Sequence, residues 1–240
     1  MGYAKLIKQS PWRLTDVFLI YALPWVLLPA VLYTWLYILA PIVPEVAQFV
    51  TAIDQENTLA SFALVIADLL FTIGVLRYLM KRRGTGLRDL GFRSFKIIKA
   101  SLLVGAVFAT FFVAIGVLYA LVQWLVPGFN PDQAQVNEFT NTPQNYQVLS
   151  LVALVILPPL VEEPVFRGLV FPALGKRWGV VAGALLSSLL FGLAHFQPNI
   201  IVYTFLLGLL LCFLYTRTGS IIPGIVVHMI NNYIAYTAQT

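Results

Sequence analysis

The chain has 240 residues, of which 60% are hydrophobic and only 10% are charged. Because an ordinary soluble domain has roughly a quarter of its residues charged, this composition excludes a water-soluble globular protein and predicts a lipid environment. The net charge of +5 does not indicate a nucleic-acid partner, since membrane proteins collect Lys and Arg in their cytoplasmic loops. We therefore expect an integral membrane protein that contacts the lipid bilayer and binds no nucleic acid.

The hydrophobic residues are gathered into continuous runs, which predict spanning helices, whereas the strands of a membrane barrel would alternate in polarity. In chain order the runs are 17–40, 59–80, 97–126, 149–174, 179–196, 200–215 and 221–236. The expected fold is an all-α, polytopic transmembrane helix bundle of about seven spans, in a single membrane domain over residues 1–240. Kinks are expected at the prolines inside the runs, namely Pro24, Pro29, Pro158, Pro159 and Pro223.

The charged residues predict how the spans are oriented. All but one of the 15 Lys and Arg residues precede the first span or flank the connections after the second, fourth and sixth spans. The opposite connections carry acidic residues and no Lys or Arg: Glu45, Asp54, Glu56, Asp132 and Glu138. By the positive-inside rule, the N-terminus is expected in the cytoplasm and the C-terminus on the opposite side.

Ionisable side chains inside spans are functional candidates, because each costs about 2.5–3.5 kcal/mol to insert. They are Asp68, Glu162, Glu163, Arg167, His195 and His228. Three of the six fall within residues 161–168, which predicts that the chemistry is concentrated there.

Glu163 and Arg167 are four residues apart and share one face of a helix, so they are expected to pair. Glu162 is turned by about 100° from Glu163 and faces elsewhere. A carboxylate in a low-dielectric site beside a second acid is suited to act as a general base near neutral pH. We expect Glu162 to be that base. The alternative for the three residues is a buried network that only holds helices together.

Two further motifs supply imidazole and amide groups. His195 follows Phe191 by four residues, and His228 precedes Asn232 by four, which places each pair on one helix face. His228 and Asn232 could donate two hydrogen bonds to one oxyanion, each worth about 3 kcal/mol in known sites. The alternatives are a packing role for His195 and an interhelical clasp for His228 and Asn232.

Together these groups are sufficient to hydrolyse a carbonyl compound without a covalent intermediate. Other hydrolytic mechanisms fit less well. Ser187 and Ser188 lie in no Gly-x-Ser-x-Gly motif, no His-Glu-x-x-His zinc motif is present, and Asp68 is the single intramembrane aspartate. Cys212 is the only cysteine, which excludes a cysteine-rich metal site. A zinc site built from the two histidines and a glutamate is possible in principle. We expect no other cofactor.

At these residues the sequence resembles the CAAX-protease and bacteriocin-processing (CPBP, or Abi) family of intramembrane glutamic peptidases, the type II CAAX prenyl endopeptidases. The family pattern is Glu-Glu-x-x-x-Arg, Phe-x-x-x-His and His-x-x-x-Asn on three late spans. It occurs here in order, within about 149–236, as Glu162-Glu163 to Arg167, Phe191 to His195 and His228 to Asn232. The stretches 208–223 and 90–93 also resemble the family.

The resemblance implies that Glu162 and His195 activate water, that His228 and Asn232 form an oxyanion hole, and that Glu163 and Arg167 support the site. It implies that no metal is needed, but it does not fix the substrate. The expected function is a metal-independent intramembrane peptidase that cleaves a peptide bond of a membrane-associated or prenylated protein. A non-catalytic membrane scaffold or bacteriocin self-immunity protein is the alternative, and a small-solute carrier is a third reading.

The resemblance also raises a question of depth. His195 lies at the outer end of its run, so it can join the other groups only if the turn at 197–199 is sunk inside the protein.

Overall fold

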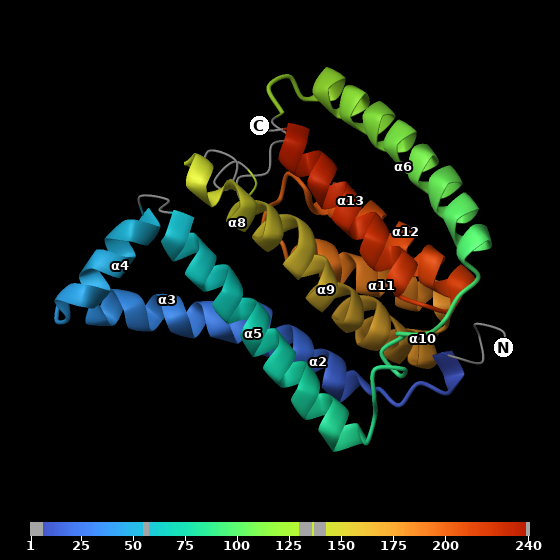
Figure 1. Cartoon of the computed structure of the whole chain (residues 1–240), viewed down its shortest axis with the longest axis horizontal. Coiled ribbons are helices and arrows are strands. Elements are labelled where there is room, and N and C mark those ends of the chain that lie inside the picture. Colours follow the sequence, from blue (N-terminus) through green and yellow to red (C-terminus); the bar gives the residue numbers. More distant parts are fainter. Residues whose placement is uncertain (1–6, 55–57, 130–135, 137–142, 239–240) are drawn as a thin grey trace.

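The structure is a computed structural model that describes residues 7–54, 58–129, 136 and 143–238. Within these ranges all regular structure is helical (Figure 1), which confirms the predicted all-α class. Four charged residues used to predict the orientation, Lys5, Glu56, Asp132 and Glu138, lie outside the described residues.

The first apolar run folds as α2 (Leu14–Ala22), the π-helical turn η1 (Leu23–Leu27) and α3 (Leu28–Leu39). A short helix that the sequence analysis did not predict, α4 (Pro44–Asp54), follows in the first connection. The second and third runs form α5 (Thr58–Arg83) and α6 (Ile97–Leu125).

The fourth run is one continuous but irregular helical rod. Its segments are η2 (Gln144–Tyr146), α8 (Gln147–Leu151), η3 (Val152–Ile156), α9 (Leu157–Glu163), η4 (Pro164–Val170) and α10 (Phe171–Trp178). The last three runs form α11 (Val180–Leu193), α12 (Ile201–Thr218) and α13 (Ile222–Ala238).

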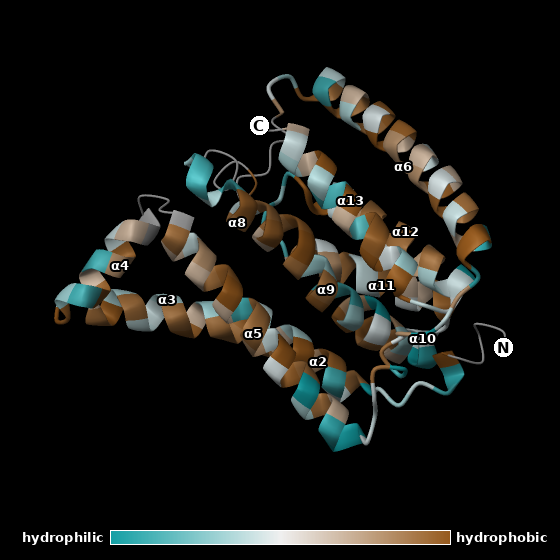
Figure 2. Ribbon diagram, viewed as in Figure 1, coloured by the Kyte–Doolittle hydropathy of each residue, from teal (hydrophilic) through white to brown (hydrophobic). Residues whose placement is uncertain are grey.

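Five helical segments are long and apolar enough to cross a membrane: Leu14–Leu39, Leu59–Arg83, Ile97–Leu125, Gln144–Trp178 and Ile201–Thr218. The other two predicted spans are shorter, with 14 residues in α11 and 17 in α13. Figure 2 shows hydrophobic residues along the length of these helices and hydrophilic residues at the end of α5, which carries Lys81, Arg82 and Arg83. The chain is a multi-pass integral membrane protein.

The irregular turns lie next to prolines, which cannot donate to the helical hydrogen-bond ladder. Pro24 lies within η1, Pro158 and Pro159 are the second and third residues of α9 after η3, and Pro164 begins η4. The expected kink at Pro223 is wrong. Pro223 is the second residue of α13, where a missing N–H leaves no helical bond unmade.

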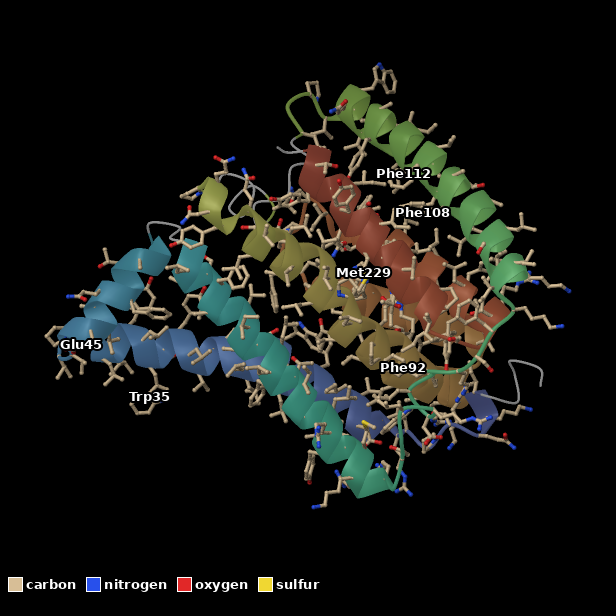
Figure 3. The ribbon with its side chains drawn as sticks, viewed as in Figure 1. Trp35, Glu45, Phe92, Phe108, Phe112 and Met229 are labelled. Atoms are coloured by element: carbon tan, nitrogen blue, oxygen red, sulfur yellow. The ribbon has the colours of Figure 1, made fainter. Side chains whose placement is uncertain are left out.

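Small residues let the late helices approach closely, as is common in membrane proteins. A Cβ atom on Gly183 of α11 would lie 2.5 Å from the Gly175 backbone of α10. A Cβ on Gly208 of α12 would lie 2.8 Å from Ser188 of α11. The helix α6 packs on the bundle through aromatic residues: Phe108 and Phe112 point toward the other helices (Figure 3).

The connection between α5 and α6 docks against the rod and α13. Leu90 is buried, and a Cβ on Gly168 of η4 would lie 2.4 Å from the Leu90 carbonyl oxygen. Gly91 has φ +92°, and its carbonyl accepts a hydrogen bond from the N–H of Ile221 at 3.0 Å. The connection therefore holds η4 and the start of α13 together.

Gly168→Ala should destabilise the protein by about 1–3 kcal/mol, since the added methyl group must displace a backbone carbonyl. The matched control is Gly116→Ala on α6, where a Cβ would meet no atom within 4 Å. Thermal unfolding in detergent measures both variants. Equal stability of the two would show that the docked connection yields without cost.

Candidate functional site

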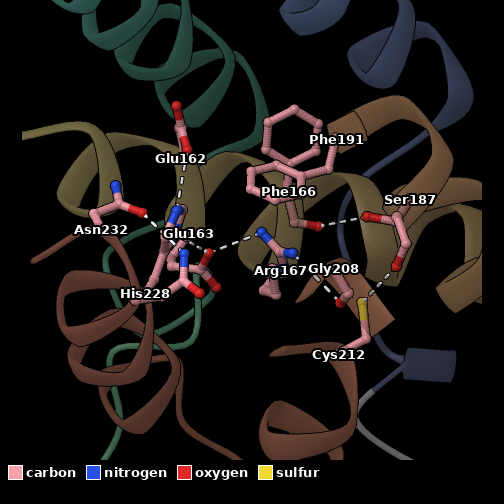
Figure 4. A network of polar contacts seen from close by, with 12 residues as sticks. Glu162, Glu163, Phe166, Arg167, Ser187, Phe191, Gly208, Cys212, His228 and Asn232 are labelled. Carbon is pink, nitrogen blue, oxygen red and sulfur yellow. Dashed lines mark hydrogen bonds and ion pairs between the residues drawn. The ribbon is translucent and has the colours of Figure 1, made fainter. Parts of the chain in front are cut away.

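The centre of the site is an ion pair buried in the bundle. Nη1 of Arg167 donates to Oε1 of Glu163 at 2.8 Å, and the side chains are 1% and 0% exposed (Figure 4). The guanidinium also donates to the carbonyl of Gly208 at 3.3 Å and lies 4.4 Å from the centre of the Phe191 ring. The pairing expected from their four-residue spacing is thus present, and it joins η4 to α11 and α12.

His228 lies between the two glutamates (Figure 4). Its Nδ1 atom is 3.0 Å from Oε1 of Glu163, and its Nε2 atom is 3.8 Å from Oε2 of Glu162. The Glu162 side chain is 19% exposed, whereas His228 is 2% exposed. Glu162 therefore faces away from Arg167, as its position on the helix predicted, and is the more accessible of the two acids.

The hydrogen bonds limit what His228 can do. A carboxylate only accepts hydrogen bonds, so Nδ1 carries the hydrogen that it shares with Glu163. Nε2 then carries a hydrogen only in the imidazolium form. In that form the charges of Glu162, Glu163, Arg167 and His228 sum to zero, an arrangement that suits a low-dielectric interior.

His195 joins the site through an aromatic ring instead of a direct hydrogen bond. The Phe191 ring lies 5.0 Å from the His195 ring and 5.5 Å from the His228 ring, edge to face in both cases. Nδ1 of His195 is 2.8 Å from the Phe191 carbonyl oxygen. Because a carbonyl only accepts, Nδ1 donates, and Nε2 of the neutral ring presents a lone pair.

The length of α11 bears on the depth of His195. Its 14 residues reach about 21 Å, which is less than the hydrocarbon thickness of about 30 Å. The helix ends at Leu193, and Phe196 has a left-handed φ of +52°. A helix of this length does not reach across the bilayer, and the depth of the turn after His195 stays a prediction.

Asn232 binds the irregular rod. Its Nδ2 group donates to the carbonyl of Leu154 at 3.0 Å. That carbonyl lacks a backbone donor because residues 158 and 159, which would donate in an α-helical or a π-helical turn, are both proline. The Asn232 amide therefore fills a gap that the two prolines create, one helical turn from His228.

Two polar residues that were not predicted as part of the site, Asn231 and Tyr203, lie beside Asn232. Nδ2 of Asn231 donates to Oδ1 of Asn232 at 3.3 Å, and the Tyr203 hydroxyl donates to Oδ1 of Asn231. The only hint of this arrangement in the sequence was the polar Asn231 within an apolar run.

Asp68, the remaining ionisable candidate, lies on α5 within range of the Glu162 charge. Within the described part of the chain, no three His, Cys, Asp or Glu side chains form a group that could hold a metal ion.

The site coincides with the part of the chain that matches a known family. Residues 144–234 match the family described as type II CAAX prenyl endopeptidase Rce1-like. The chain therefore carries an Rce1-like segment, which confirms the resemblance seen in the three motifs.

Curated relatives match over similar lengths. An uncharacterized 24.3 kDa protein of Escherichia coli is 37% identical over 34% of this chain and 40% of its own. YdiL of Bacillus subtilis is 33% identical over 40% of this chain and 41% of its own. Human CAAX prenyl protease 2 is 30% identical over 35% of this chain and 31% of its own. The matches thus span less than half of each relative, and no solved structure matches.

Glu163→Gln should destabilise the protein by about 3–5 kcal/mol, because Arg167 is left as a buried charge without its counterion. Glu162→Gln is the matched control, since it makes the same chemical change one residue earlier on a more exposed side chain. Expression yield and thermal unfolding in detergent compare the two. Similar stability of both variants would contradict the central place given to the buried pair.

Proposed function

We propose that this chain is an intramembrane endopeptidase that hydrolyses a peptide bond with a water molecule activated by Glu162, without a metal ion. The observation that carries the proposal is the position of His228, 3.8 Å from the accessible Glu162 and 3.0 Å from the buried Glu163. One acid is left open to a water molecule, while the other fixes the imidazole. The match to a CAAX prenyl endopeptidase family supports the reaction class.

In the proposed reaction Glu162 removes a proton from water as the water oxygen bonds to the peptide carbonyl carbon. The carbonyl oxygen becomes an oxyanion, which accepts hydrogen bonds from Nε2 of His228 and from the second Nδ2 hydrogen of Asn232. The tetrahedral intermediate then breaks its carbon–nitrogen bond. Glu162 gives its proton to the departing amine and returns to a carboxylate.

His195 is assigned to the water and not to the oxyanion. With Nδ1 donating to the Phe191 carbonyl, Nε2 can accept a hydrogen bond from water and orient its lone pair. Phe191 separates this imidazole from His228. The two histidines then act on opposite sides of the reaction, which is the division that the family resemblance implies.

The proposed substrate is a membrane-associated or prenylated protein. This rests on the family description and on the name of the human relative, a CAAX prenyl protease. We place the whole activity in a single membrane domain. The competing function is a non-catalytic membrane scaffold, and one observation favours it: the bond from Asn232 to Leu154 would also serve as a helix clasp.

Purified protein should cleave a quenched farnesylated peptide, and Glu162→Gln should leave no turnover above background, because the base is lost while the shape is kept. Glu45→Gln, an exposed acid on the distant α4 (Figure 3), is the matched control and should retain full turnover. Activity should persist in strong chelators.

The same peptide without its farnesyl group tests the substrate class. Full turnover by Glu162→Gln would reject the mechanism, and zinc-restored activity after chelation would reject its metal independence.

We also propose that the N-terminus is cytoplasmic and the C-terminus lies on the opposite side, from the distribution of basic residues. Expressed in a bacterium, alkaline phosphatase fused after Thr240 should be active, and the enzyme inserted between α5 and α6 should be inactive. The reverse pattern would invert the orientation.

A further inference from the structure

We propose that Tyr203 and Asn231 are positioning residues that hold the Asn232 amide with its nitrogen toward the reacting carbonyl. The inference rests on the proposed function for its catalytic consequence. The hydrogen-bonded arrangement itself can be tested without any activity. Neither residue belongs to the three motifs from which the site was predicted.

The three side chains form a chain of hydrogen bonds that all point the same way. The Tyr203 hydroxyl donates to Oδ1 of Asn231. Nδ2 of Asn231 donates to Oδ1 of Asn232 at 3.3 Å, and Nδ2 of Asn232 donates to the Leu154 carbonyl at 3.0 Å. The chain runs from α12 through α13 to η3, so it crosses three segments of the bundle.

The direction of these bonds decides which end of the Asn232 amide faces the site. An amide has a donor end and an acceptor end. A hydroxyl group beside it can both donate and accept, so it could pair with either end. The Leu154 carbonyl requires a donor, and Asn231 supplies a donor to the other end. With one Nδ2 hydrogen on Leu154, the second hydrogen is left for an oxyanion. Hydrogen bonds in such a chain also polarise one another, which strengthens that donor.

Tyr203 is held firmly enough to impose this direction. The residue is 9% exposed, and its ring is stacked on that of Tyr119, with 6.3 Å between the ring centres and an interplanar angle of 9°. Phe111 packs on the same ring at 5.6 Å. Both neighbours belong to α6, so the outlying helix α6 contributes to the site by fixing the tyrosine.

A structural role alone would predict a different result from a positioning role. If Tyr203 only ties helices together, its loss would lower stability and would affect turnover regardless of Asn232. If it positions the amide, its loss acts through Asn232 and has no further effect once that amide is gone. A double-mutant cycle separates the two roles.

The first arm of the experiment measures the Asn232 amide directly. In protein labelled with ¹⁵N-asparagine, the Asn232 side-chain signals are assigned by their loss in Asn232→Asp. Tyr203→Phe, which keeps the ring, and Asn231→Asp, which removes the donor, should each shift both amide hydrogens. Tyr119→Phe is the control: it removes a hydroxyl group from the same aromatic stack and should leave the signals of both Asn232 amide hydrogens unshifted. Unchanged signals in Tyr203→Phe would overturn the proposal, even if Asn231→Asp fails to fold.

The second arm measures turnover. Tyr203→Phe should lower kcat about tenfold with KM unchanged, the equivalent of one ordinary hydrogen bond. Asn232→Ala should lower it about 10²–10³-fold, and adding Tyr203→Phe to Asn232→Ala should cause no further loss. An equal tenfold loss in both backgrounds would overturn the positioning role. Absence of any Glu162-dependent turnover would instead reject the proposed function, and the amide signals would still decide the arrangement.

Discussion

Arg167 carries a charge that cannot leave the interior of the bundle, and the rest of the site is arranged around it. The guanidinium takes Glu163 as its counterion, the Gly208 carbonyl as a second acceptor and the face of Phe191 as a third contact. These partners come from α9, α12 and α11. Glu163 in turn binds His228 of α13. Loss of the counterion would leave a charge uncompensated in a low-dielectric medium. Arg167 therefore joins three helices directly and a fourth through Glu163.

A second constraint is the shortage of backbone donors near prolines. The rod that carries the two glutamates has wide turns on both sides of them, η3 before and η4 after. In η3 the Leu154 carbonyl, which lacks its helical donors, accepts a hydrogen bond from Asn232. In η4 the Phe166 carbonyl accepts the N–H of Phe171 and, as a second bond, the Ser187 hydroxyl at 3.1 Å. Side chains of α13 and α11 thus bind carbonyls of the rod at both wide turns.

Contacts within one helical turn could be predicted from the sequence, and contacts between distant helices could not. The pairing of Glu163 with Arg167 and the separate direction of Glu162 follow from a spacing of four residues and from helical geometry. The place of His228 between the glutamates depends on how α13 packs, 65 residues along the chain. The Leu154 carbonyl could have been singled out from the sequence, because consecutive prolines at 158 and 159 remove both of its helical donors. The partner of Tyr203 could not be predicted, since nothing in the apolar run that contains Tyr203 indicates a bond to Asn231.

The short α11 has a consequence for the path of water into the bundle. A helix of about 21 Å leaves roughly a third of the hydrocarbon thickness of about 30 Å uncovered. A bilayer meets such a short segment by thinning around it. Thinning of this kind at the Leu193 end of α11 would bring headgroups and their hydrating water toward the turn that follows the helix. The shorter diffusion path for water would suit the role proposed for His195.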